Sequence, residues 1–153
     1  RNPEREKLGL FSRPLYRDLP MGALVRADVP LADGVALATT LASGKQTVLT
    51  KEGFSYGAEV DQWLSAPGVR RVSTGSEPLQ LVRMLLASRA DMLLVAPEEG
   101  QLLMAQHPPG ALRMVRFSDV GPGLDRHLYC NTRVPEEVLR RFDKELDRVT
   151  PSR

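Results

Sequence analysis

The sequence predicts an α/β fold, and three observations support that prediction. From about residue 21 onward, short apolar runs alternate with longer amphipathic ones, which is typical of the strands and helices of an α/β sheet. The run DMLLV at 91–95 is continuously apolar, as expected of a strand covered on both faces in a parallel sheet. With 153 residues, 42% of them hydrophobic, the chain can bury one sizeable core, and two full domains are not expected.

Strands and helices are expected to alternate along the central part of the chain. The apolar runs predict strands at 21–26, 46–50, 69–73, 91–95 and 112–117. The amphipathic segments between them predict helices at 32–42, 56–65, 77–88 and 98–107. The third of these helices should begin behind Ser76 as its N-cap, with Glu77 and Pro78 in the first turn, where acid and proline are favoured.

The last part of the chain follows a different pattern. Gly121-Pro122-Gly123 interrupts the alternation, and the run HLYCN at 127–131 is strand-like. Residues 135–149 then place apolar side chains on one helical stripe, namely Val138, Leu139, Phe142, Leu146 and Val149. We therefore expect a strand followed by an amphipathic C-terminal helix.

The charge balance and the apolar content exclude several classes of partner. The formal net charge of +2 is the difference between 21 basic and 19 acidic residues, and the basic ones are scattered, so no nucleic acid partner is expected. No apolar run approaches the roughly 20 residues that span a bilayer, and we expect a soluble chain. The opening RNPER has neither an initiator methionine nor a signal peptide, which suggests a processed or truncated N-terminus.

Metal, cofactor and nucleophile chemistry find little support in the sequence. Cys130 is the only cysteine, which excludes an intramolecular disulfide and a multi-cysteine metal site. His107 and His127 have no cysteine or carboxylate at metal-ligand spacing, and we expect neither a metal nor another cofactor. His127 and Cys130 resemble a nucleophile pair, but residues three apart on a strand point to opposite faces. We interpret Cys130 as a buried structural thiol.

The motif GFSYG at 53–57 is the first candidate site. It follows a predicted strand and precedes a predicted helix, so Gly53 can make a tight or left-handed turn and Ser55 can cap the helix. The free N–H groups of the helix's first turn would attract a carboxylate or another anion. Phe54 and Tyr56 could stack on a ligand or pin the loop to the core, and the whole motif could also be a simple strand-to-helix turn.

Ser76 is a second, weaker candidate. It lies in STGSEPLQ, between the end of a predicted strand and the start of a helix. Loops at the carboxyl ends of parallel strands border the ligand crevice of open α/β sheets. Ser76 is therefore either a ligand contact or only the helix N-cap.

Three segments resemble the periplasmic solute-binding proteins of the polar-amino-acid type (family 3), which have the type 2 periplasmic-binding fold. GFSYG followed by AEVDQWL, and then LVRMLLASRADMLLV at 81–95, is similar to the family's second lobe. In its turn Ser88-Arg89-Ala90-Asp91, serine replaces the glycine of a Gly-Arg-x-Asp pattern. NPEREKLGLFSRPLY and the C-terminal HLYCNTRVPEEVLRRFDKEL are similar to parts of the first lobe.

The resemblance implies a lobe organisation and a carboxylate-binding residue. It implies partial lobe one and hinge at 1–21, a complete lobe two at 22–118, and a return to lobe one with a C-terminal helix at 119–153. Arg5 matches the family arginine that pairs with a ligand carboxylate, a role that suits its planar fork of donors. The family's chains are longer because the first half of lobe one comes before the segment where this sequence begins. We therefore expect the flanking pieces to pair with another copy, as a homo-oligomer or strand-swapped dimer.

One departure from the family argues against an amino acid as the ligand. In the family's amino-acid binders, an aspartate after the Gly-Arg-x-Asp turn pairs with the ligand's ammonium group, and the matching residue here is Ala96. Without a partner, that ammonium would be desolvated at a cost of several kcal/mol. Glu98 or Glu99 could replace the aspartate, although both also suit the start of a helix.

By resemblance, the function is non-catalytic capture of a small polar or anionic solute in the periplasm, such as an amino acid or a carboxylate, for the permease of an ABC transporter. Arg5 would bind from one lobe and Gly53, Phe54, Ser55, Tyr56 and Ser76 from the other, with closure driven by ligand affinity. One alternative is the ligand-sensing domain of a membrane receptor. Another is a dehydratase-like enzyme with Glu52 as its acid–base residue.

Overall fold

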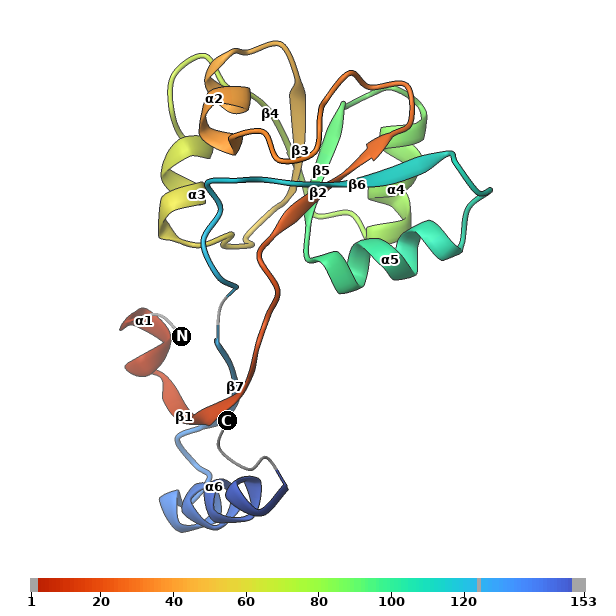
Figure 1. Ribbon diagram of the computed structural model, residues 1–153. Coiled ribbons are helices and arrows are strands. Elements are labelled where there is room, and N and C mark those ends of the chain that lie inside the picture. The colour runs from red at the N-terminus through yellow and green to blue at the C-terminus, as the bar shows by residue number, and fades with distance from the viewer. Residues whose placement is uncertain (1–2, 124, 150–153) are drawn as a thin grey trace. The chain divides into compact units, whose positions relative to one another are not determined.

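A computed structural model of the chain describes residues 3–123 and 125–149, and it forms two compact units (Figure 1). The central unit is the continuous segment Leu19–Pro122. The terminal unit takes the segments that precede and follow it in the sequence.

The central unit is built on a five-stranded sheet. Its strands are β2 (Gly22–Arg26), β3 (Thr47–Lys51), β4 (Arg70–Thr74), β5 (Met92–Val95) and β6 (Leu112–Arg116), in the order β4-β3-β5-β2-β6. β3 pairs in parallel with β4 and β5, whereas β2 is antiparallel to both β5 and β6. The expected parallel sheet is therefore mixed, because an alternation of runs does not specify the direction of the first strand. All four residues of β5 are buried, as its apolar sequence predicts.

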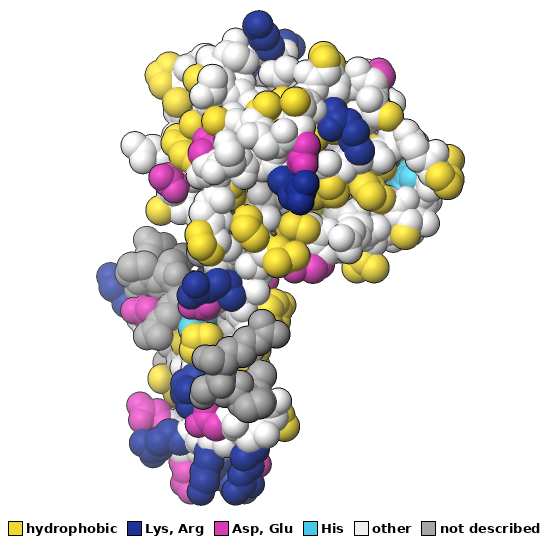
Figure 2. All heavy atoms as spheres, viewed as in Figure 1, with side chains coloured by type: hydrophobic (Ala, Val, Ile, Leu, Met, Phe, Trp, Pro, Cys, Tyr) yellow, Lys and Arg dark blue, Asp and Glu magenta, His cyan; other side chains and the backbone are white. Residues whose placement is uncertain are grey.

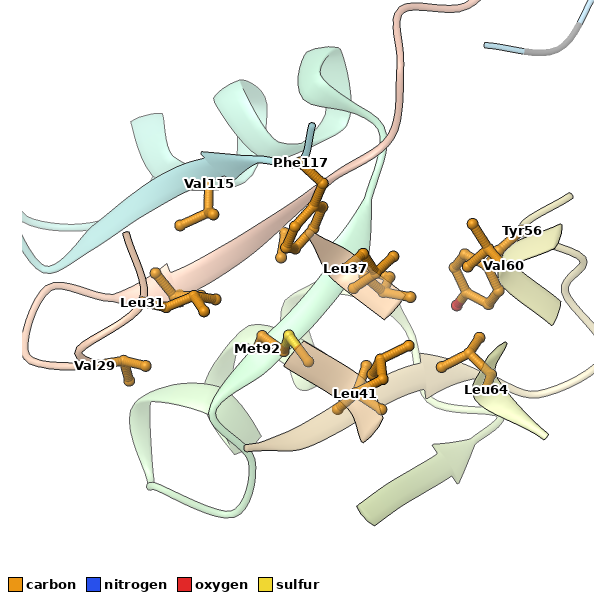
Figure 3. Close-up of a cluster of buried hydrophobic side chains, with 14 residues drawn as sticks. Val29, Leu31, Leu37, Leu41, Tyr56, Val60, Leu64, Met92, Val115 and Phe117 are labelled. Atoms are coloured by element: carbon orange, nitrogen blue, oxygen red, sulfur yellow. The ribbon is translucent and has the colours of Figure 1, made fainter. Parts of the chain in front are cut away.

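Two helices cover each face of this sheet, and the alternation of side chains along the strands supplies a core to both. α2 (Leu37–Ala42) and α3 (Ala58–Leu64) pack on one face, where Ala23, Val25, Met92 and Leu94 of the strands meet Leu37, Leu41, Val60 and Leu64 (Figure 3). α4 (Pro78–Leu86) and α5 (Pro97–Ala105) pack on the other, where Leu24, Leu93 and Val95 meet Leu81, Val82, Leu85 and Leu103. Along β2 and along β5, successive side chains thus pack into opposite cores, because the side chains of a strand alternate between the two faces of the sheet.

The helices expected at 32–42 and 77–88 begin later than predicted, as does the helix expected at 56–65, which begins at Ala58. The helix expected at 32–42 begins at Leu37, because Gly34 has a φ of 80° and the chain at Val35 forms a parallel bridge with Phe117 instead of a helical turn. α4 begins behind Glu77, not Ser76, with Pro78 at the first helical position. Pro78 restricts the residue before it to extended backbone, and Glu77 has a φ of −68° and a ψ of 155°.

The turn Ser88-Arg89-Ala90-Asp91 is structural. Ser88 ends α4 with a φ of 57°, the left-handed conformation in which glycine is the favoured residue. The Asp91 carboxylate accepts the Thr47 N–H at 2.7 Å, and the Arg26 guanidinium donates to the carbonyls of Leu85 and Ala90. This turn therefore fastens the start of β5 to β3 and β2.

The terminal unit contains a two-stranded antiparallel sheet and two helices. Its elements are α1 (Pro3–Glu6), β1 (Gly9–Arg17), β7 (Asp125–Asn131) and α6 (Glu136–Val149). On the predicted stripe of α6, Leu139 is buried, Phe142 and Leu146 are half-buried, and Val138 and Val149 are exposed. Arg13 of β1 is bonded to α6 through its N–H to Asp143 and its guanidinium to Asp147.

Cys130 and His127 lie on β7. Cys130 is half-buried, so its expected full burial is wrong: β7 belongs to a sheet of only two strands, which cannot enclose it. Nδ1 of His127 is 2.8 Å from the Ser12 carbonyl oxygen, which makes the imidazole part of the β1–β7 hydrogen bonding. Among the described helices, none is long and apolar enough to cross a membrane.

Candidate functional site

The candidate residues of the central unit gather at one edge of its sheet. Since β3, β4, β5 and β6 run the same way, the loops that follow them leave the sheet at a common carboxyl edge. β2 runs the opposite way, so the segment before it enters at this same edge. The carboxyl edge therefore holds 52–57, 75–77, Ala96 and 117–122, together with 19–21.

The loop at 52–57 turns at its two glycines and is pinned to the core by Tyr56. Gly53 has a φ of 70° and Gly57 a φ of 98°, backbone shapes that side chains disfavour. The Tyr56 ring is only 7% exposed, and its hydroxyl oxygen accepts the Lys51 N–H at 2.7 Å. Burial raises the pKa of the Tyr56 hydroxyl, so it stays neutral at physiological pH. Tyr56 thus supports the loop, which was one of its two expected roles.

Asp61 of α3 binds the same loop from the helix side. Its Oδ2 accepts the Ser55 hydroxyl at 2.6 Å, and its Oδ1 accepts the Tyr56 N–H at 2.9 Å. The N-cap of α3 is Gly57, with no side-chain cap. Ser55 therefore does not cap the helix as expected, because its hydroxyl is bonded to Asp61.

Phe54 is the exposed aromatic side chain of this loop. Its ring is 52% exposed, and its centroid lies 6.0 Å from that of Tyr56. The Lys51 ammonium lies 5.9 Å from the centroid of the Phe54 ring, within the range of a cation–π contact. An exposed aromatic ring can pack against a ligand.

The next loop along the edge, which contains Ser76, is tied to the first. The Glu52 N–H donates to the Thr74 carbonyl at 2.9 Å, and the hydroxyls of Thr74 and Ser76 are 2.9 Å apart. A Cβ placed on Gly75 would stand 3.7 Å from Oε2 of Glu52. The Glu52 carboxylate therefore lies beside the loop that follows β4, and Ser76 is half-buried within it.

The remaining strand ends offer fewer groups. Ala96 is the N-cap of α5 and makes no side-chain cap, while Glu98 and Glu99 are exposed in the first turn of that helix. Asp119, after β6, accepts the N–H groups of Leu37 at 2.6 Å and Ala38 at 2.9 Å, so it caps α2. Within the described part of the chain, no group of three or more His, Cys, Asp or Glu side chains could hold a metal ion.

Arg5 belongs to the terminal unit, whereas the other five predicted site residues belong to the central unit. It is the basic residue in the last turn of α1, its side chain is exposed, and its carbonyl accepts the Tyr129 hydroxyl at 3.3 Å.

Sequence reasoning missed Asp61 and Asp119. The first binds a serine six positions earlier, and the second caps a helix 82 residues away in sequence, so neither matches a short capping motif. The weak signal that could have indicated Asp61 is an acidic residue in the first turns of a helix that follows a serine-containing loop.

No protein-family model matches the chain, and no curated protein matches it either. Solved structures do match over nearly its whole length. Holo ArgBP from T. maritima has a TM-score of 0.74 at 19% identity, covering 99% of this chain and 62% of that one. An ancestral arginine-binding protein bound to arginine has a TM-score of 0.74 at 15% identity, with 97% and 62% covered.

A third similar structure is AbpA, an amino acid ABC transporter substrate-binding protein from Streptococcus pneumoniae, bound to L-arginine. Its TM-score is 0.74 at 16% identity, with 97% of this chain and 58% of that chain covered. The chain thus spans about three fifths of the length of these proteins. The similarity confirms the fold, an α/β fold of the type 2 periplasmic-binding kind that is present in part.

Proposed function

We propose that the chain is an extracytoplasmic solute-binding protein, or part of one, that captures a small polar solute in the periplasm for an ABC transporter. One observation carries the proposal: nearly the whole chain superposes on substrate-binding proteins of amino acid transporters, several of which hold arginine or glutamine. The placement of its candidate loops supports it, because they share the carboxyl edge of the sheet.

The proposed ligand contacts follow from the geometry of the loops. In the central unit we assign them to the backbone of Gly53, the exposed ring of Phe54 and the hydroxyls of Ser55 and Ser76. Tyr56 contributes by holding the loop through its buried ring. In the terminal unit we assign carboxylate binding to Arg5, whose guanidinium can donate two parallel hydrogen bonds.

The role proposed is non-catalytic, in keeping with structural relatives that are binding proteins. The partner proposed is the permease of the transporter. We also propose that copies associate through the terminal unit, because its described strands form a sheet of only two and each keeps one unpaired edge. A light-scattering measurement that gives a monomer at high concentration would refute this association.

A thermal-shift screen tests the function. The chain is melted with L-arginine, L-glutamine, L-glutamate and succinate, each at millimolar concentration. A ligand that binds only the folded state raises the melting temperature, and we expect a rise with at least one of these solutes. No rise with any of them contradicts the proposal.

The Arg5 assignment has its own control. Arg5→Ala should reduce the shift produced by a carboxylate ligand, while Lys7→Ala, which removes a nearby exposed cation, should not. Equal effects of the two variants would mean that general charge, and not Arg5, attracts the solute.

A further inference from the structure

Asp61 fixes the direction in which the Ser55 hydroxyl donates. An ionised carboxylate has acceptor oxygens and no hydrogen to give, so the 2.6 Å contact between Ser55 Oγ and Asp61 Oδ2 uses the single hydroxyl hydrogen of Ser55. The other carboxylate oxygen is occupied by the Tyr56 N–H at 2.9 Å. Both oxygens of Asp61 thus hold the loop.

Toward a ligand, the Ser55 hydroxyl can therefore only accept a hydrogen bond. Its oxygen has two lone pairs, and among the described residues the neighbour that donates to it is the Gly57 N–H at 3.4 Å, a long contact. Ser55 is exposed, so a ligand can reach the remaining lone pair. A carboxylate cannot use it, because a carboxylate would need a hydrogen that Ser55 has already given to Asp61.

Two neighbours of Ser55 also suit a cation. The Phe54 ring is 52% exposed and can bind a cation, as the Lys51 ammonium over it at 5.9 Å from its centroid shows, although the charge of Lys51 itself opposes a second cation there. The exposed Glu52 carboxylate lies beside Gly75 in the adjoining loop. Of these two groups, which take no part in the Ser55–Asp61 contact, Glu52 is the one whose charge favours a cationic ligand group.

The loop is held in this conformation by its own hydrogen bonds, without a ligand. Tyr56 is held at its N–H by Asp61 and at its hydroxyl by the Lys51 N–H, and Gly57 turns the backbone between Tyr56 and α3. We infer that Asp61 is a positioning residue that makes Ser55 a hydrogen-bond acceptor, so that the ligand group meeting the Ser55 hydroxyl is a donor such as an ammonium or guanidinium. This inference rests on the proposed function, and it concerns the Ser55 hydroxyl alone, because the N–H groups of the first turn of α3, from which the sequence suggested an anion, take no part in the Ser55–Asp61 contact.

Asp61→Asn should turn the Ser55 hydroxyl from an acceptor into a donor toward the ligand. The amide oxygen can still accept the Tyr56 N–H, but the amide nitrogen now donates to Ser55, whose hydroxyl hydrogen is free to point outward. With L-arginine as the probe in calorimetry, we expect binding to weaken about tenfold, the size of one hydrogen bond to a charged group. Tighter binding in Asp61→Asn would overturn the inference, since it would mean that the ligand presents an acceptor to Ser55.

Two further variants distinguish the effect of the Ser55–Asp61 hydrogen bond from the effect of negative charge on the helix. Glu59→Gln removes an exposed acid from the same helical turn and should change the affinity by less than about twofold. In a Ser55→Ala background, Asp61→Asn should have no additional effect. Equal losses in Glu59→Gln and Asp61→Asn, or a full loss in the Ser55→Ala background, contradict the role assigned to Asp61.

Amide exchange at Tyr56, read by NMR, tests the positioning role without any ligand. Exchange should be at least tenfold faster in Asp61→Ala and unchanged in Asp61→Asn and Ser55→Ala, because only the first variant removes the acceptor of the Tyr56 N–H. Unchanged exchange in Asp61→Ala overturns the positioning role. If the wild-type chain binds no solute of the screen, the proposed function and the ligand class both fail, while this exchange rate still decides what Asp61 does.

Discussion

The central and terminal units are stabilised by different means. In the central unit, both faces of a five-stranded sheet are covered by helices and filled with buried aliphatic side chains. In the terminal unit, Leu139 is the one buried hydrophobic side chain among the described residues, and ion pairs such as Arg13–Asp147 and Arg17–Asp125 connect its elements. Figure 2 shows charged side chains of both signs crowded over α6.

This difference predicts where stability resides. Burial of apolar surface contributes about 25 cal/mol per Å², whereas an exposed ion pair contributes between about 0 and 1 kcal/mol. We therefore expect the central unit to be the more stable of the two. The terminal unit has few comparable contacts of its own.

The largest effect is expected from the core of the central unit. Leu49→Ala removes a fully buried side chain between β3 and α4 and should lower the free energy of unfolding by about 3 kcal/mol. Leu102→Ala, at a side chain that is 68% exposed, is the matched control and should change it by less than about 0.5 kcal/mol. Urea denaturation followed by circular dichroism measures both, and similar losses would refute the core between the sheet and helices α4 and α5.

A moderate effect is expected at Tyr56. Tyr56→Phe keeps the buried ring and leaves the Lys51 N–H without its acceptor, which should cost about 1 to 2 kcal/mol. Because burial raises the pKa of the hydroxyl above its usual value of 10.0, the neutral form stabilises the fold below that pH. This contribution disappears as the pH rises through the higher pKa of the folded state. Stability measured at alkaline pH should therefore fall less steeply in Tyr56→Phe than in the wild type, and parallel curves would contradict this.

A smaller gain is expected at Ser88. Its φ of 57° strains any residue with a side chain, so Ser88→Gly should stabilise the central unit by about 0.5 kcal/mol after the greater freedom of glycine in the unfolded chain is subtracted. Ser43→Gly serves as the control, because Ser43 has a φ of −64° and should lose stability on the same change. Thermal unfolding of both variants checks the two opposite signs.

The smallest effect is expected at acidic pH, at one exposed ion pair in each unit. The hydrogen bond from Arg116 lowers the pKa of Asp33, and that from Arg17 lowers the pKa of Asp125. Each carboxylate stabilises the fold above its unfolded pKa of about 3.8 and loses this contribution as the pH falls through the lower pKa of the folded state. Asp33→Asn and Asp125→Asn should flatten the stability curve slightly below about pH 4, because water screens both pairs. A steep loss of stability in either variant at pH 7 would contradict this.

Sequence patterns located the central strands well because their signal is local. All five predicted strands of the central unit agree with the structure within one residue at each end. β1 was missed because Pro14 argues against a strand, and in the structure Pro14 lies between the two register shifts of the β1–β7 pair. The start of α2 was wrong because pairing of Val35 with Phe117 is a long-range contact that the Ala- and Leu-rich run does not reveal.

The candidate site also has features that depend on neighbouring residues and features that depend on contacts made only in the fold. The position of the 53–57 loop at the end of a strand could be predicted, since it depends on neighbouring residues. Its polarity could not, because it depends on which partner takes the Ser55 hydroxyl hydrogen, and that partner lies on the following helix.

Whether the carboxyl edge binds a solute is best tested by amide chemical-shift mapping of the isotope-labelled chain during titration with L-arginine. We expect saturable shifts at Phe54, Ser55 and Ser76 that share one dissociation constant, with Ser88 and Arg89, which follow the C-terminus of α4, unaffected. Saturating arginine that leaves the first three amides unchanged would contradict it.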